Sequence, residues 1–258
     1  MKIDNSYKQP YNQSFCAIPI AKYCYLQEKT KDVVVYKLEK RDINYLKHIS
    51  DNIDKFYKRN NIKDESTMQV VKEAFEAAVE ILKGKKSFEE KAKILLAMFG
   101  KEPSAILIGN TLKVDKNGNF HYSSRKNHSK DETELDWLAT WNKKILGEGK
   151  VIVTEFFNSV LKDGFKQVYV RSEIPEKSFA MNFYKKMGFD TLSDEAREIQ
   201  RKNDNRYLIG NFDDFEDTII PMKATTQDML ESYNKHKKEL DRFELVNHPS
   251  VELPELDF

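Results

Sequence analysis

The sequence is poor in cysteine, in long apolar runs and in charge of one sign, and each shortage excludes a class of protein. Two of its 258 residues are cysteines, too few for a disulfide framework. Lys and Arg number 43 and Asp and Glu number 42, so the net charge of +1 argues against a chain that holds nucleic acid or an anionic membrane by bulk charge. No apolar run approaches the roughly 18 residues of a membrane span. We therefore expect a cytoplasmic protein with no membrane or nucleic-acid partner.

The histidines are too few and too scattered to form a metal centre. The chain has five of them, and none has the spacing of metal ligands. We therefore expect no metal cofactor. Hydrophobic residues make up 40% and aromatic residues 12% of the chain, which is enough for a sizeable core.

Hydrophobic periodicity predicts a helical first half after an initial strand. Residues 33–38 have the composition of a strand, and apolar residues recur at three- and four-residue steps over 43–56 and 66–84, as expected of helices. Ser87 and Glu90 have capping-box spacing, so we predict a third helix over 87–100.

The second half alternates strands with helices. Asn117-Gly118 predicts a hairpin turn between two strands. The predicted strands are 105–114, 120–122, 135–141, 168–170, 207–210 and 218–222, and the predicted helices follow Gly149, Pro175 and Thr226. This order predicts one α+β domain around a mixed sheet.

The chain is expected to have one main domain with two flanking pieces. We predict a polar, mobile leader over residues 1–31, a domain over 32–224 with a helical enlargement at 62–100, and a C-terminal helix and tail over 225–258.

The turn before the helix at residue 149 is the most informative feature. Gly147 and Gly149 allow a bulky anion to approach the backbone, and the N–H groups of the first helical turn would point at it. A Walker motif is excluded because Val151 follows Gly149-Lys150, and a dinucleotide fingerprint is excluded because Ile152 stands where a glycine is needed. Taken alone, the pattern fits a tight connection equally well.

Two motifs together point to a known family. Residues 144–149, Lys-Ile-Leu-Gly-Glu-Gly, match Arg/Gln-x-x-Gly-x-Gly/Ala, and residues 180–189 match Ala-x-x-x-Tyr-x-x-x-Gly-Phe. Over residues 133–189 the chain resembles the core of the GNAT superfamily of acyl-CoA N-acyltransferases. The resemblance implies a GNAT-like, mostly antiparallel sheet flanked by helices. It also implies transfer of acetyl from acetyl-CoA, as co-substrate, to a primary amine on a small molecule, peptide or protein.

The resemblance also implies a site. The strand 135–141 should part from the strand 167–171, and the gap should bind the pantetheine arm as if it were another strand. A backbone N–H near Ala139 is the expected stabiliser of the oxyanion, and Tyr184 is the expected acid for the departing thiolate. The implied cofactor-binding residues are Ala139, Thr140, Trp141, Lys144, Gly147, Glu148, Gly149 and Lys150.

Two acidic residues are candidates for the base that deprotonates the amine. Glu134 and Asp136 are two residues apart on a strand and therefore point to the same side. We favour Glu134 as the base, with Asp136 as a substitute or as a clamp for a cationic amine. The two residues fit the solvent face of a half-buried strand equally well.

Several departures from the family pattern leave a second function open. Lys144 stands where Arg or Gln is usual, and Glu148 brings a carboxylate beside the expected diphosphate. Glu148 either points outward and favours the helix N-terminus or weakens CoA binding. From periodicity alone, Tyr184 fits an aromatic residue at the edge of the core. The alternative function is therefore a catalytically degenerate module that binds CoA or a protein partner.

Overall fold

The fold is known from a computed structural model. It describes residues 17–26, 32–59, 65–84, 92–114, 120–122, 132–141, 147–173, 179–191, 219–238 and 243–246. The strands are β1 (Ile18–Tyr25), β2 (Asp32–Leu38), β3 (Lys93–Phe99), β4 (Glu102–Val114), β5 (Phe120–Tyr122), β6 (Glu132–Thr140), β7 (Gln167–Glu173), β8 (Asp190–Thr191), β9 (Ile219–Thr225) and β10 (Phe243–Val246). The helices are the 3-10 turn η1 (Lys40–Asp42) and the α-helices α1 (Ile43–Arg59), α2 (Glu65–Leu82), α3 (Glu148–Lys162), α4 (Phe179–Lys186) and α6 (Thr226–Lys238).

The strands form a single mixed sheet in the order β10-β1-β2-β3-β4-β6-β7-β9-β8, with β5 paired to β4 outside this order. Among the described strands, β6 and β7 form a parallel pair, and the other pairings are antiparallel. A parallel pair requires a crossover, and α3 supplies it. The predicted α+β class, with a mostly antiparallel sheet flanked by helices, is confirmed.

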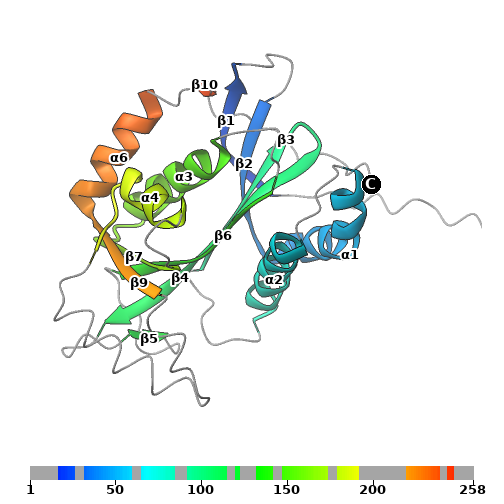
Figure 1. Cartoon of the computed structure of the whole chain (residues 1–258), viewed down its shortest axis with the longest axis horizontal. Coiled ribbons are helices and arrows are strands. Elements are labelled where there is room, and N and C mark those ends of the chain that lie inside the picture. Colours follow the sequence, from blue (N-terminus) through cyan, green and yellow to red (C-terminus); the bar gives the residue numbers. More distant parts are fainter. Residues whose placement is uncertain are drawn as a thin grey trace, which may run out of the picture.

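Helices cover both faces of the sheet. Figure 1 shows α1 and α2 on one side and α3, α4 and α6 on the other. Each side has its own apolar core, because side chains of a central strand point alternately to the two faces. In β4, Ala105 and Leu107 belong to the core under α3, which we call the α3-side core, and Ile106 and Ile108 belong to the core under α1 and α2, which we call the α1-side core.

The predicted helix at 87–100 is wrong: the described part of this range contains β3, a central strand. All seven residues of β3 are buried, with Leu95 and Ala97 in the α3-side core and Ile94 and Leu96 in the α1-side core. A strand covered on both faces is apolar throughout, so its sequence lacks the alternation that identifies a strand. The predicted helical enlargement at 62–100 is therefore helical only at α2 in its described part.

The two flanking pieces also contain strands. Residues 18–25, predicted to lie in a mobile leader, form β1, which pairs with β2. Residues 243–246, predicted to lie in a tail, form β10, which pairs with β1 in antiparallel register from Lys22–Val246 to Tyr25–Phe243. β10 is not evident locally, because its partner β1 lies far away in the sequence.

Most other predicted elements are confirmed. The helices α1, α2, α3, α4 and α6 and the hairpin pairing of β4 with β5 lie where the pattern predicts them. The predicted strand at 207–210 lies outside the described residues. Within the part of the chain that the structure describes, no helix combines the length and hydropathy that a membrane crossing requires.

Candidate active site

The central parallel pair of strands is joined along only part of its length. β6 and β7 pair from Glu132–Gln167 to Leu135–Val170. Beyond this point β6 continues to Thr140 and remains paired with β4, and β7 continues to Glu173 and remains paired with β9. The two strands therefore part after Leu135, as the resemblance predicts.

The register decides which backbone groups of β6 face this gap. The N–H of Trp141 donates to the carbonyl of Ser104 at 3.3 Å, and Ala139 lies opposite Ile106. Because hydrogen-bonding residues alternate in an antiparallel pair, Ala139 and Trp141 direct their backbone groups to β4. Leu138 and Thr140 direct theirs to the gap.

The expectation that Ala139 and Trp141 supply the hydrogen bonds in the gap is therefore wrong. The direction of a backbone group depends on the hydrogen-bond register with the neighbouring strand, and the residues of β6 alone do not contain this information. Trp141 is instead a core residue: its ring lies 5.6 Å from that of Phe75, and its side chain is 2% exposed. Of the predicted strand residues, Thr140 is both exposed and correctly oriented.

The first turn of α3 presents backbone N–H groups beside the gap. Gly147, the N-cap, has a left-handed conformation with φ 109°, which glycine adopts readily. Its carbonyl accepts the N–H of Lys150 at 3.0 Å and of Val151 at 3.2 Å. Among the described residues, no hydrogen-bond acceptor is found for the N–H groups of Gly147, Glu148 and Gly149. The resemblance implies a site at residues 147–150, which have four amides. Three of these lack an acceptor among the described residues, and the fourth, that of Lys150, is already bonded to Gly147.

Gly149 lies where the end of β6, the start of α3 and α4 meet. A Cβ at this position would be 3.4 Å from two ring carbons of Phe183 and 3.6 Å from Cγ2 of Thr140. A methyl group would therefore be in ordinary van der Waals contact, and a larger side chain would fill the space between these residues. The lack of a side chain at Gly149 leaves this space beside the amides of α3 open.

The side chain of Glu148 points into the protein, so the alternative in which it points outward is wrong. It is 2% exposed, and neither carboxyl oxygen has a hydrogen-bond partner among the described residues. Burial raises the pKa of Glu148 from 4.5 to about 8. The nearby Ser104 hydroxyl lowers the pKa of Glu148 to a smaller extent. This hydroxyl donates its own hydrogen to the carbonyl of Ala97 at 3.1 Å. At neutral pH the group is therefore mostly protonated and places little negative charge beside the free amides.

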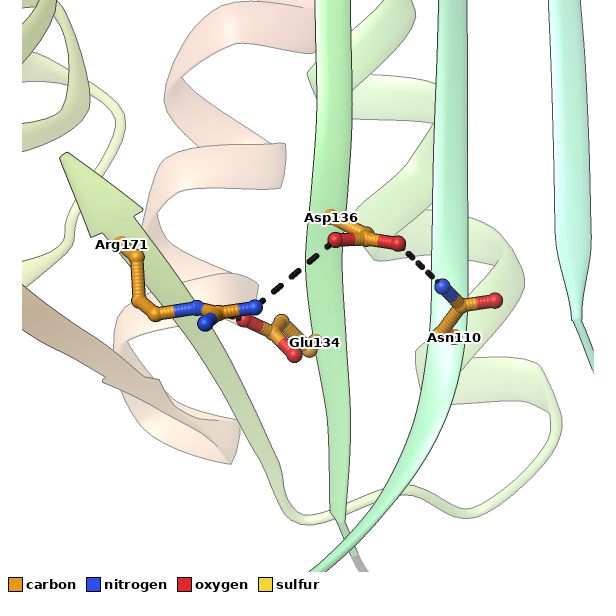
Figure 2. Close-up of polar contacts among 4 residues, drawn as sticks. All are labelled: Asn110, Glu134, Asp136 and Arg171. Atoms are coloured by element: carbon orange, nitrogen blue, oxygen red, sulfur yellow. Dashed lines mark hydrogen bonds and ion pairs between the residues drawn. The ribbon is translucent and has the colours of Figure 1, made fainter. Parts of the chain in front are cut away.

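Farther along β6, the two candidate bases gather around a guanidinium group. Arg171 of β7 donates from Nε to Oε1 of Glu134 at 2.7 Å, and its Nη2 lies 3.9 Å from Oδ1 of Asp136 (Figure 2). Asn110 of β4 donates from Nδ2 to Oδ2 of Asp136. Both carboxylates thus lie on the same side of the sheet, as predicted. Arg171 and Asn110 were not singled out from the sequence, because cross-strand register brings them to the cluster.

One of the two carboxylates, Asp136, lies in a β-bulge. Trp137 lies opposite Ile108 and Leu135 opposite Gly109, so Asp136 is an extra residue without an opposite residue in β4. The bulge reverses the alternation of β6: Leu135 belongs to the α3-side core, whereas Trp137 packs against the α1-side core. The cluster therefore lies at the end of the paired segment, where the strands begin to part.

The two carboxylates differ in their access to solvent. The side chain of Glu134 is 2% exposed, and that of Asp136 is 25% exposed. Asp136 is therefore accessible from solvent without rearrangement of the sheet. Glu134 is covered and held by Arg171.

Tyr184 belongs to α4, the helix that contacts the start of α3. Its ring is half-buried and makes edge contacts with Phe183 at 5.4 Å and with Phe189 at 5.6 Å between centroids. Phe183 is the residue that packs beside Gly149. Tyr184 is thus next in sequence to a residue lining the gap. Lys144 lies outside the described residues, and within them no group of acidic, histidine or cysteine side chains has the geometry of a metal site.

The buried carboxyl group of Glu148 predicts a pH-dependent stability. Its pKa in the folded protein is about 8, and its ordinary value is 4.5. The unfolded chain therefore loses this proton first, so stability should fall by about 1.4 kcal/mol per unit as the pH rises between these two values. We expect Glu148→Gln and Glu148→Met to remove this slope from urea-unfolding free energies measured between pH 5 and 8. A slope that survives both substitutions would assign the titration to another group.

Comparisons with known proteins were made by sequence and by structure. No protein-family model matches the chain, and no curated protein matches it by sequence. Among solved structures, it is similar to a GNAT-family acetyltransferase from Desulfovibrio desulfuricans, described as putative, with 11% identity and a TM-score of 0.45, covering 75% of this chain and 99% of the other.

Two further solved structures belong to named acetyltransferases. An aminoglycoside 6'-acetyltransferase type Ii is 12% identical, with a TM-score of 0.44, covering 74% of this chain and 96% of the other. The PaiA N-acetyltransferase of Thermoplasma acidophilum, solved with coenzyme A, is 14% identical, with a TM-score of 0.40, covering 75% and 98%. At this level of similarity no activity, acceptor or ligand is transferred to this chain.

Proposed function

We propose that the protein is an acyl-CoA-dependent N-acyltransferase that moves an acetyl group from acetyl-CoA to a primary amine by direct attack. The observation that carries this proposal is the gap between β6 and β7, which opens beside the free amides of α3. A ligand that suits both features has an amide-containing arm and a multiply charged anionic end. Coenzyme A has both.

The residues of the chain fit this ligand in two places. Leu138 and Thr140 direct backbone N–H and C=O groups into the gap, where an extended pantetheine arm would pair with them. Gly147, Glu148 and Gly149 offer N–H groups at the positive end of the helix dipole, which suits a diphosphate. Lys144 and Lys150 are proposed to add positive charge there.

The cluster around Arg171 is proposed to prepare the acceptor. A primary amine has a pKa near ~10.4 and is mostly protonated at neutral pH, so a base must remove a proton before it attacks. We assign this role to Asp136, because it is the accessible carboxylate, and assign Glu134 to holding Arg171. This reverses the order that we favoured from the sequence.

The transfer can be written with all atoms in balance. Bound acetyl-CoA supplies a thioester, whose C–S bond breaks as the amine nitrogen bonds to the carbonyl carbon. Asp136 accepts the proton that the ammonium group loses before attack and releases it to water, and the nitrogen loses its second proton to water as the C–S bond breaks. The N–H of Leu138 or Thr140 donates to the carbonyl oxygen, where negative charge develops. Tyr184 gives a proton to the departing sulfur and regains one from water.

Acetyl-CoA should stabilise the folded protein, and a large side chain at position 149 should abolish this effect. At a concentration 100 times its Kd, a ligand of the folded state adds about 2.7 kcal/mol. We expect Gly149→Leu, whose side chain would fill the space beside Phe183 and Thr140, to lose the shift in Tm measured with acetyl-CoA. Gly149→Ala is the matched control and should retain most of it. An equal shift in all three proteins would remove the start of α3 from the site.

Asp136→Asn should lower kcat by about 100-fold, because the amide cannot accept the proton of the amine. The measurement is thiol release from acetyl-CoA with a panel of amines. Glu134→Gln is the matched control and should affect stability more than kcat, because it removes a buried partner of Arg171. Unchanged turnover in Asp136→Asn would exclude it as the base. If acetyl-CoA binds and no amine releases thiol, the alternative of a non-catalytic module is favoured.

Tyr184→Phe should lower kcat by about tenfold or more and leave the Kd of acetyl-CoA nearly unchanged, because the hydroxyl acts only as the thiolate departs. Tyr45→Phe is a suitable control, since Tyr45 is a buried residue of α1 whose hydroxyl contacts Sδ of Met98 in β3. The outcome that contradicts the role of Tyr184 is a kcat equal to that of the control.

A further inference from the structure

The C-terminal segment of the chain contacts two parts of the proposed cofactor site, the end of α4 and the turn that precedes α3. Helix α6 contacts the end of α4: Nε2 of His236 lies 3.2 Å from the carbonyl oxygen of Lys186, and a Cβ at Gly188 would be 3.1 Å from the carbonyl oxygen of Asp228. Strand β10 follows α6 and reaches the start of α3. Figure 1 shows α6 on the same side of the sheet as α3 and α4.

An aromatic ring of β10 lies beside the turn that precedes α3. A Cβ at Gly147 would be 3.2 Å from Cε2 and 3.8 Å from Cδ2 of Phe243, and apart from the chain neighbours of Gly147 no other side chain of the described residues lies within 4 Å of that position. Phe243 is 4% exposed, and its ring lies 5.2 Å from that of Tyr25 in β1. Tyr25 in turn makes an edge contact with Phe99 of β3, at 5.7 Å. The ring beside Gly147 is therefore fixed to the sheet.

Gly147 needs such a support because glycine restricts its own backbone so little. It populates positive and negative φ about equally in the absence of other contacts. Its left-handed conformation directs its carbonyl oxygen to the N–H groups of Lys150 and Val151 and leaves its own N–H and the next two free. A rotation at Gly147 would break these two hydrogen bonds and turn the free N–H groups away from one another.

We propose that Phe243 is a positioning residue, which holds the left-handed turn at Gly147 in the conformation that binds the diphosphate of coenzyme A. The role in binding rests on the proposed function, whereas the role in holding the turn does not. Phe243 acts through Gly147 and contacts no reacting atom. The C-terminal strand is thereby part of the cofactor site, although it is the last described strand of the chain and lies far from the site in sequence.

Leu245 provides a matched control on the same strand. It is partly buried and packs against the same α3-side core, and its partner in β1 is Tyr23 rather than Tyr25. Truncation of either side chain to alanine removes apolar contacts from β10, but only Phe243→Ala removes the ring beside Gly147. Phe243→Leu is the conservative variant that keeps apolar bulk at this position.

The test uses the full chain and three measurements. Hydrogen exchange reports the Lys150 and Val151 amides, which are bonded to Gly147. We expect their protection to fall about tenfold in Phe243→Ala, to be partly restored in Phe243→Leu and to change in Leu245→Ala only as much as that of the other α3 amides. Calorimetry with acetyl-CoA should show a Kd about tenfold higher in Phe243→Ala than in Leu245→Ala. In steady-state assays KM for acetyl-CoA should rise while kcat stays within twofold.

The outcomes separate this inference from the proposed function. If the wild-type protein binds no acetyl-CoA but Phe243→Ala selectively exposes the two amides, the proposed function fails and the positioning of the turn stands. If the wild-type protein binds acetyl-CoA and the two alanine variants match in exchange and in Kd, the positioning role is overturned. If Phe243→Ala does not fold, Phe243→Leu is compared with Leu245→Ala instead, and it should show the same selective loss of protection to a smaller extent.

Discussion

The site depends on one constraint: among the strands that the structure describes, β6 beyond Leu135 has a partner on one side only. The β4 side is paired in regular register from Ile108–Trp137 to Ala105–Thr140, whereas β7 has turned away. Backbone polar groups inside a protein are almost always paired, so an unpaired row in the middle of a sheet is a place for an added extended chain. The free amides of α3 begin at the same opening. A ligand that uses both has amide groups along its length and negative charge at its end.

The charge at the start of α3 is controlled by burial. A carboxylate in the first turn of a helix is normally favoured by the dipole, which would keep Glu148 ionised. Its burial outweighs the dipole and raises its pKa to about 8. Glu155, also buried on α3, has donors: the Tyr23 hydroxyl bonds to Oε1, and Asn158 donates to Oε2 at 3.2 Å. The two glutamates of this helix thus differ: Glu155 has hydrogen-bond donors, whereas Glu148 has none among the described residues. Glu148 is the one that lies where a negative charge would repel an anion.

Local sequence was sufficient for features that local chemistry defines. Glycine spacing identified the turn at Gly147, and the three-to-four-residue apolar period identified α1, α2, α3 and α4. Features defined by cross-strand register could not be predicted. The sequence of β3 resembles a helix because both of its faces are covered, β10 is defined by its pairing with the distant β1, and the assignment of Leu138 rather than Ala139 to the gap follows from hydrogen-bond alternation with β4.

Which of the two carboxylates is accessible could not be predicted from the sequence. Both lie on one side of β6, but the bulge makes Asp136 an extra residue at the end of the paired segment, where it is 25% exposed. Glu134 lies in the paired segment and is 2% exposed. A base must exchange its proton with acceptor and solvent, whereas a group that fixes a guanidinium works best when covered and rigid. Arg171 joins the two carboxylates: it is held by the covered one and lies beside the accessible one, so the partial separation of two strands determines which carboxylate would be available to the proposed acceptor.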